Sequence, residues 1–379
     1  MSTNPDISVR IDQLTVTRFV AAILLVLFHT AATGLTTDSV AGRLLLAGNS
    51  AVSFFFVLSG FILVVSSGHD GRLPTYITKS RFWRNRFARI YPLYLAALVL
   101  TLTADVLTHN GTFHRIHAGS AVSSALLLQA WLPPYAMDLN YPGWSLSVEV
   151  FFYALFPLLF TGVVRLSTQR LVVLTGLVWV VSLAIHRYMV QQIDLGATTD
   201  YHALTMYLPV LHLNTFLVGM TTGVVFVRHR SWLSQRRNWL LLALLILSVA
   251  AGWVVWTQHP VLRLRHNGIA APLFAVLVLW LSCQSNGLSR GLSHPALVYL
   301  GDISYGVYLL QVPVSTLSFY ANSRWLHLPT GLYLLTYLFL LCLVAAASYH
   351  WVEQPARRFI RQWTLPRFAS TDEQVSQSA

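Results

Sequence analysis

Two basic side chains in the first long apolar run are the first residues of this chain that could do chemistry. Arg18 and His29 are 11 positions apart, which in an α-helix brings them within about 20° of one face and about 16 Å apart along the axis. An ionisable side chain inside such a run is costly, so each is a candidate functional residue. The alternatives are an interfacial anchor for Arg18 and a structural hydrogen bond between helices for His29.

A carboxylate lies about one and a half turns into another apolar run, where residues 143–149 read Gly-Trp-Ser-Leu-Ser-Val-Glu. Unpaired, Glu149 would be expensive to bury. We therefore expect it to face a polar cavity or a partner such as His29 or an arginine. An imidazole and a carboxylate together suggest general acid–base chemistry, and a purely structural ion pair is the alternative.

Four arginine residues precede the apolar part of a third run: Arg81, Arg84, Arg86 and Arg89. A guanidinium group offers two parallel donors that match phosphate oxygens. The cluster therefore favours a phosphorylated ligand, and the alternative is a topology signal that also binds lipid headgroups. No glycine-rich phosphate loop accompanies it, so ATP-driven transport finds no support.

The amino-acid composition indicates which class of protein must position these residues. Of 379 residues, 55% are hydrophobic and 10% are charged, where an ordinary soluble domain has roughly 25% charged residues. A soluble enzyme is excluded. Cys283 and Cys342 are the two cysteines, too few for a disulfide scaffold or a cysteine-rich zinc site. The histidines His109, His114 and His117 fit no zinc spacing, so no metal is expected.

The apolar runs predict an all-α, polytopic integral membrane protein with about ten transmembrane helices. They lie at about 14–34, 48–66, 89–107, 144–164, 171–190, 204–227, 238–257, 268–284, 298–320 and 331–352. The apolar segment 120–132 is too short to span, and Pro133-Pro134 closes it, so we expect a re-entrant or interfacial helix.

Basic residues orient these spans. Lys and Arg total 25 against 13 Asp and Glu, and with ten spans most of them fall on the cytoplasmic side, together with both termini. The excess therefore reflects topology and does not indicate nucleic acid binding. We expect a cytoplasmic N-terminal tail at 1–13, a membrane domain at 14–358 and a cytoplasmic C-terminal tail at 359–379, disordered at its end.

Six segments together resemble the acyltransferase family 3 membrane proteins, bacterial enzymes that O-acylate polysaccharides, lipopolysaccharide and some antibiotics. They are Arg18 with His29, then 54–61, 86–94, 144–153, 304–311 and 351–357. Their order across about residues 12 to 358 makes the resemblance specific. Members commonly carry His where this chain has Gln311, so a proton-transfer role at that position is in doubt.

The resemblance implies an O-acetyltransferase of a bacterial inner membrane that uses acetyl-CoA or another acyl-CoA as a co-substrate, with no resident cofactor. It implies a sugar hydroxyl of a cell-surface glycan or exopolysaccharide as the acceptor, and membrane lipids and a homo-oligomer are further candidate partners. His29 would be the base, alone or with Glu149, or would carry a covalent acetyl group. Donor-binding candidates are Arg18, Arg84, Arg86 and Arg89. Candidates to line the cavity are Ser59, Tyr91, Trp144, Ser145, Ser147, Tyr305 and Gln311.

Two other classes of function compete with this one. A transporter or flippase for a glycan or small molecule would also use intramembrane Arg, His and Glu, but the apolar runs show no obvious repeat between halves. A sensor or assembly partner without catalysis is disfavoured because Arg18, His29 and Glu149 are all present.

Overall fold

A computed structural model describes residues 11–31, 39–69, 71–108, 117–257, 264 and 266–362. The predicted N-terminal tail therefore lies almost wholly outside the described residues, as do His109, His114 and the C-terminal tail after Gln362. The described part of the chain is helical and contains no β-strand, only an isolated bridge between His69 and Arg72. The predicted all-α class is confirmed.

Nine helices of the described residues are long and apolar enough to cross a membrane, which confirms an integral membrane protein. Their cores are α1 (Thr15–Ala31), α3 (Ala51–Ser67), α4 (Lys79–Thr108), α6 (Gly143–Arg165), α7 (Thr168–Asp194), α9 (Leu213–Gln235), α10 (Arg237–Trp256), α13 (Pro295–Ala321) and α14 (Thr330–Ser348). The remaining predicted run, 268–284, forms the shorter apolar helix α11 (Ala271–Ser282). Gly268 precedes it with a left-handed φ of 93°, a conformation that suits glycine and delays the start of the helix.

Short helices connect these elements: α2 (Val40–Ala47), α5 (Ala118–Ala125), α8 (Thr199–Tyr207), α12 (Gly287–Leu292) and α15 (Gln354–Gln362). The segment at 120–132 contains α5 and a 3₁₀ turn at Gln129–Trp131. Eight helical residues rise only about 12 Å, so this segment does not form a spanning helix, as predicted. Leu127, with a φ of 57°, separates the two pieces.

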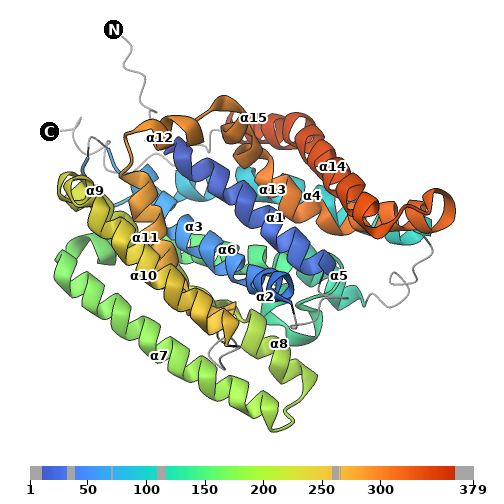
Figure 1. Ribbon diagram of the computed structural model, residues 1–379, viewed down its shortest axis with the longest axis horizontal. Coiled ribbons are helices and arrows are strands. Elements are labelled where there is room, and N and C mark those ends of the chain that lie inside the picture. Colours follow the sequence, from blue (N-terminus) through green and yellow to red (C-terminus); the bar gives the residue numbers. More distant parts are fainter. Residues whose placement is uncertain are drawn as a thin grey trace, which may run out of the picture.

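The helices form a bundle whose centre contains α1, α3, α6 and α13 (Figure 1). α1 and α14 pack against α13, and α9 packs against α3. α10 has no fully buried side chain within the described residues, and α7 also exposes many apolar side chains. Because both helices lie along the outer face of the bundle, they offer an apolar surface that suits lipid.

Glycine residues bring α3 and α9 into close contact. A Cβ atom added to Gly60 would overlap the backbone of Phe216, and one added to Gly219 would overlap the backbone of Val57. Small residues allow membrane helices to approach this closely and gain dispersion energy. The contact fixes the position of α3, and α3 forms one wall of the cavity described next.

Candidate active site

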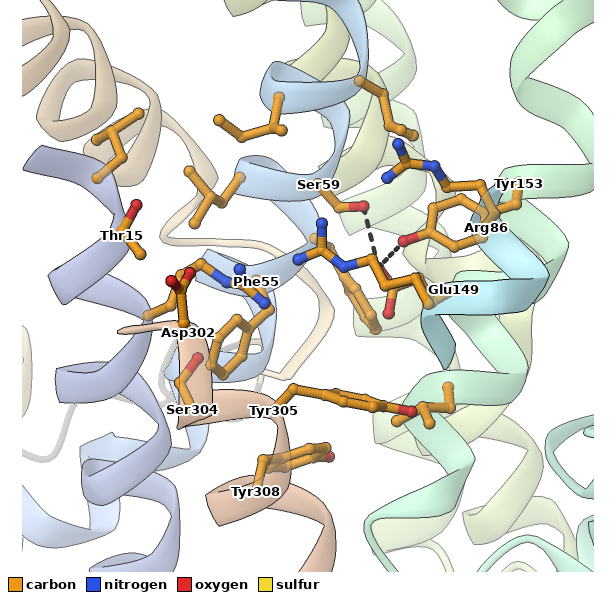
Figure 2. A pocket seen from close by; sticks show the side chains of 18 of the residues that line it. Thr15, Phe55, Ser59, Arg86, Glu149, Tyr153, Asp302, Ser304, Tyr305 and Tyr308 are labelled. Atoms are coloured by element: carbon orange, nitrogen blue, oxygen red, sulfur yellow. Dashed lines mark hydrogen bonds between the residues drawn. The ribbon is translucent and has the colours of Figure 1, made fainter. Parts of the chain in front are cut away.

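One cavity of about 430 Å³ lies between α1, α3, α4, α6 and α13 (Figure 2). Residues of the C-terminal helical turn Tyr349–Glu353 and of α15 also line it. Along α3 its wall runs from Val52 to Ser66. At 1.5 Å per residue this wall is about 21 Å long. The cavity is therefore elongated and suits a ligand with a long, narrow arm.

The cavity is rich in cations. Its charged lining residues are Arg18, Arg86, Arg89, Arg357 and Arg361 with the acids Glu149, Asp302 and Glu353. No hydrogen bond or ion pair within the described residues holds the guanidinium group of Arg18 or Arg89. Arg86 lies over the rings of Phe82 and Tyr153, at 5.6 and 5.8 Å, and its buried Nε has no partner there. These donors remain available to an anionic ligand.

Glu149 faces this cavity from α6. Its carboxylate accepts hydrogen bonds from the hydroxyl of Ser59 on α3, at 3.2 Å, and from the hydroxyl of Tyr153, one turn further along α6 (Figure 2). Two hydroxyl donors fix the orientation of the carboxylate and offset part of the cost of burying it. Glu149 thus lies in polar surroundings, as expected from the sequence.

His29 lies near the C-terminal end of α1 and does not line the cavity. Its Nδ1 is 2.8 Å from Oε1 of Gln311. The amide nitrogen of Gln311 donates to the carbonyl oxygen of Tyr308 at 2.6 Å, which fixes the orientation of the amide. Because Oε1 can only accept, Nδ1 of His29 carries the hydrogen and Nε2 carries the free lone pair.

The second neighbour of His29 is Tyr141, whose ring meets the imidazole edge-on at a centroid distance of 4.8 Å. Burial raises the pKa of Tyr141 to about 12, so its phenol stays protonated at neutral pH. The imidazole is therefore held between a neutral aromatic ring and a neutral amide.

Tyr308 links the cavity to His29. Its ring lines the cavity, and its hydroxyl donates to the carbonyl oxygen of Pro142 at 3.0 Å and lies 2.7 Å from the hydroxyl of Ser145. Gln311 follows Tyr308 by three residues on α13. His29 therefore lies about one helical turn from the cavity wall. Of the surroundings expected for Glu149, the polar cavity is the one found. A hydrogen bond with His29 is not among those of the described residues, where the two side chains have different partners.

The structure brings most of the other predicted residues to the cavity. Arg18, Arg86, Arg89, Ser59, Ser145 and Tyr305 all line it. The hydroxyl of Tyr305 donates to the carbonyl oxygen of Ile90 at 2.8 Å and so ties α13 to α4. Gln311 does not line the cavity and contacts His29 instead.

Four predicted residues lie elsewhere. Arg84 is about 200° around the helix from Arg86 and does not line the cavity. The hydroxyl of Tyr91 donates to the carbonyl oxygen of Ala125 at 3.1 Å, and Trp144 stacks on His266 with ring centroids 4.8 Å apart. Ser147 is buried away from the cavity, and its hydroxyl has no partner among the described residues.

Sequence reasoning missed several lining residues, namely Tyr153, Asp302, Ser304, Tyr308, Glu353, Arg357 and Arg361. A signal was present for four of them. Tyr153 follows Glu149 by four residues, one turn along the same helix. Glu353, Arg357 and Arg361 recur at intervals of four, which places them on one helical face. Arg357 indeed pairs with Glu353 at 3.5 Å.

Comparison with known proteins places the chain among acyltransferases. A family model described as an acyltransferase domain matches residues 11–350. The chain is similar to the acyltransferase MdmB of Streptomyces mycarofaciens, with 30% identity over 322 residues that cover 81% of this chain and 79% of that protein.

Two further relatives are longer proteins. The chain is 25% identical to the putative peptidoglycan O-acetyltransferase YrhL of Bacillus subtilis (strain 168), over 82% of this chain and 50% of that one. It is 23% identical to the O-acetyltransferase OatA of Staphylococcus aureus (strain NCTC 8325 / PS 47), over 82% of this chain and 53% of that one. The chain thus spans about half the length of these two relatives. No solved structure matches it.

Proposed function

Because the chain belongs to this acyltransferase family and is an integral membrane O-acyltransferase, we propose that it moves an acyl group, most simply acetyl, from acyl-CoA to a sugar hydroxyl. The observation that carries the proposal is the elongated cavity, with guanidinium groups at one end and the Tyr308–Gln311–His29 contacts near its wall. A CoA thioester has the same order of parts, with phosphates at one end and the reactive carbonyl at the other.

The donor enters from the end where α1 begins. Arg18, Arg86 and Arg89 bind its phosphates, since guanidinium forks match phosphate oxygens. The pantetheine arm lies along α3, whose cavity wall of about 21 Å exceeds the separation of about 16 Å between Arg18 and His29. The thioester carbonyl can therefore reach the region of Tyr308 and His29.

His29 provides the base. Its Nε2 takes the proton of the acceptor hydroxyl, and the hydroxyl oxygen attacks the carbonyl carbon of the thioester. The tetrahedral intermediate collapses as the carbon–sulfur bond breaks, and the CoA thiolate takes up the proton. A covalent acetyl group on Nε2 is the alternative route and uses the same lone pair.

Glu149 has a supporting role in this proposal. Held by Ser59 and Tyr153, its carboxylate faces the cavity and does not contact His29, so it would offset the positive charge that forms on His29 during transfer only through space. Charge stabilisation of this kind is strong where water is excluded.

The acceptor belongs to a cell-surface or exported glycan, and the protein lies in a bacterial inner membrane with both termini in the cytoplasm. The name of the relative YrhL, which contains the word peptidoglycan, supports a glycan as the acceptor. The arginine cluster supports a cytoplasmic donor side, where CoA is found. A transporter or flippase gains no support from relatives that are named acyltransferases.

Acyl transfer by purified protein tests the proposal. His29→Ala should lower the rate of transfer from labelled acetyl-CoA by roughly 10² to 10⁴, the range for loss of a general acid or base, while CoA binding persists. Mass spectrometry of the surface glycans identifies the acceptor from an acyl mass increment. A His29→Ala protein that transfers at the parent rate would remove the proposed mechanism.

A further inference from the structure

The C-terminal helix α15 adds cations to the cavity that the proposed donor site has not yet used. Arg357 and Arg361 lie one turn apart on the same face of α15, and both line the cavity. α15 packs against α4, the helix that carries Arg86 and Arg89. The cavity therefore has one group of cations from α1 and α4 and a second group from α15.

The second group is the outer one. Figure 1 shows α15 at the end of the bundle where α1 begins. Arg361 is exposed, whereas Arg18, Arg86 and Arg89 are half-buried. Arg361 therefore stands at the mouth of the cavity, with Arg357 one turn behind it.

Arg357 is held in place but is not saturated. One of its terminal nitrogens is 3.5 Å from Glu353, and its side chain is 28% exposed. Its buried Nε has no hydrogen-bond partner in the described part of the chain. A guanidinium group with five donors and one long ion pair retains donors for a second anion.

The ligand of the proposed function carries its charges in a matching order. From the thioester, CoA presents the pantetheine arm, then a pyrophosphate, then a ribose with a 3′-phosphate. A phosphate monoester has about −1.5 to −2 charges near neutral pH, and it lies farthest from the reactive carbonyl. Inner cations therefore meet the pyrophosphate, and outer cations meet the terminal phosphate monoester.

We propose that Arg361, with Arg357 behind it, forms a separate subsite for the 3′-phosphate of the CoA donor, while Arg18 and Arg89 face the pyrophosphate. The subsite rests on the proposed use of acyl-CoA. It makes α15 part of donor recognition, so the enzyme distinguishes CoA from the same nucleotide without its 3′-phosphate.

Binding of CoA and of 3′-dephospho-CoA to purified protein in detergent tests the subsite. The parent should bind CoA more tightly, by roughly tenfold to a hundredfold, as expected for loss of charged hydrogen bonds. Arg361→Ala should weaken CoA binding by a similar factor and leave dephospho-CoA binding unchanged, so that the preference disappears. Arg89→Ala should weaken binding of both nucleotides and keep the preference.

Arg358→Ala is the matched control. Arg358 lies on the same helix, is exposed, and donates to Gln354 at 3.3 Å without lining the cavity. It should bind both nucleotides as the parent does. Arg361→Lys keeps the charge without the fork and should restore part of the preference, which separates a binding role from a folding defect.

The outcomes distinguish the subsite from the donor proposal. A parent that binds both nucleotides equally, or an Arg361→Ala protein that keeps the full preference, overturns the subsite alone. A parent that binds neither nucleotide overturns the use of CoA as well. The same measurements in nanodiscs with and without anionic lipid test the other source of phosphate. If anionic lipid abolishes the preference of the parent, Arg361 is a lipid headgroup site and the subsite proposal fails.

Discussion

Replacing Gln311 tests whether the amide fixes the tautomer of His29. Gln311 is 1% exposed and holds two hydrogen bonds, at 2.8 Å to Nδ1 of His29 and at 2.6 Å to the carbonyl oxygen of Tyr308. Gln311→Leu keeps most of the volume and removes the acceptor. Nδ1–H then loses its partner, and the competing tautomer, which carries its proton on Nε2, gains population at the expense of the base.

The size of the effect follows from that one hydrogen bond. A donor left unsatisfied in a buried site costs about 1 to 3 kcal/mol, and each 1.4 kcal/mol is a factor of ten. The rate of acyl transfer should therefore fall roughly 5- to 150-fold in Gln311→Leu, with CoA affinity unchanged. Ser315→Ala is the control on the same helix, because within the described part of the chain its hydroxyl donates to the carbonyl oxygen of Val312 alone.

Gln311→Glu separates this electrostatic role from simple packing. A carboxylate still accepts a hydrogen bond from Nδ1–H but also stabilises the imidazolium. His29 therefore stays protonated to higher pH, and the neutral imidazole that acts as the base is populated only at higher pH. The acid limb of the pH–rate profile should move up by about 1 to 2 pH units. Tyr141 faces the ring but does not titrate in this range, because burial raises its pKa to about 12. Parent-like rates and pH profiles in both variants would refute the assigned tautomer.

The remaining predictions concern charge, donor binding and topology. Glu149→Gln keeps the shape and removes the charge, so transfer should fall at least about tenfold, with Tyr153→Phe showing a smaller loss; a parent-like rate in Glu149→Gln would make the carboxylate structural. Arg89→Ala should weaken CoA binding by roughly 1.5 to 3 kcal/mol and Arg89→Lys should restore only part of it; unchanged affinity in the alanine variant would make Arg89 a topology signal. Reporters fused after Ser167 and after Thr198 should read cytoplasmic and outer respectively, and the reverse at both points would mean that the segment 120–132 crosses the membrane.

The fold was largely predictable because hydrophobic length determines membrane helices. Each predicted run corresponds to a helix, and the errors lie at helix ends. α4 begins at Lys79, ten residues before the predicted run at 89–107, because backbone hydrogen bonds continue through a polar arginine segment. α11 is shorter than its run because Gly268 and the residues around it form turns.

The site was predictable where it depends on position within one helix. Arg18, Glu149 and Arg89 came from single spans and line the cavity. Arg84 and Arg86 are about 200° apart around their helix, so helical geometry alone could have predicted that they do not face the same cavity. Partners from different helices could not be predicted in this way. That Ser59 holds Glu149, and that Gln311 holds His29, follows from how α3 packs against α6 and α1 against α13. The contact of Tyr153 with Glu149 is different, because the two residues lie one turn apart on α6 and their spacing alone could have predicted it.

The close contact of α3 with α9 has a consequence for how this enzyme tolerates mutation. Neither Gly60 nor Gly219 lines the cavity, yet any side chain at either position would push α3 away from α9, and the opposite side of α3 is the cavity wall that carries Ser59. A mutational scan that selects for acyl transfer would therefore score both glycines as sensitively as substrate-binding positions. In such a scan, loss of activity would identify positions where two helices pack too closely to accept a side chain as well as positions that contact the donor. A separate measurement of donor binding would distinguish the two kinds of position.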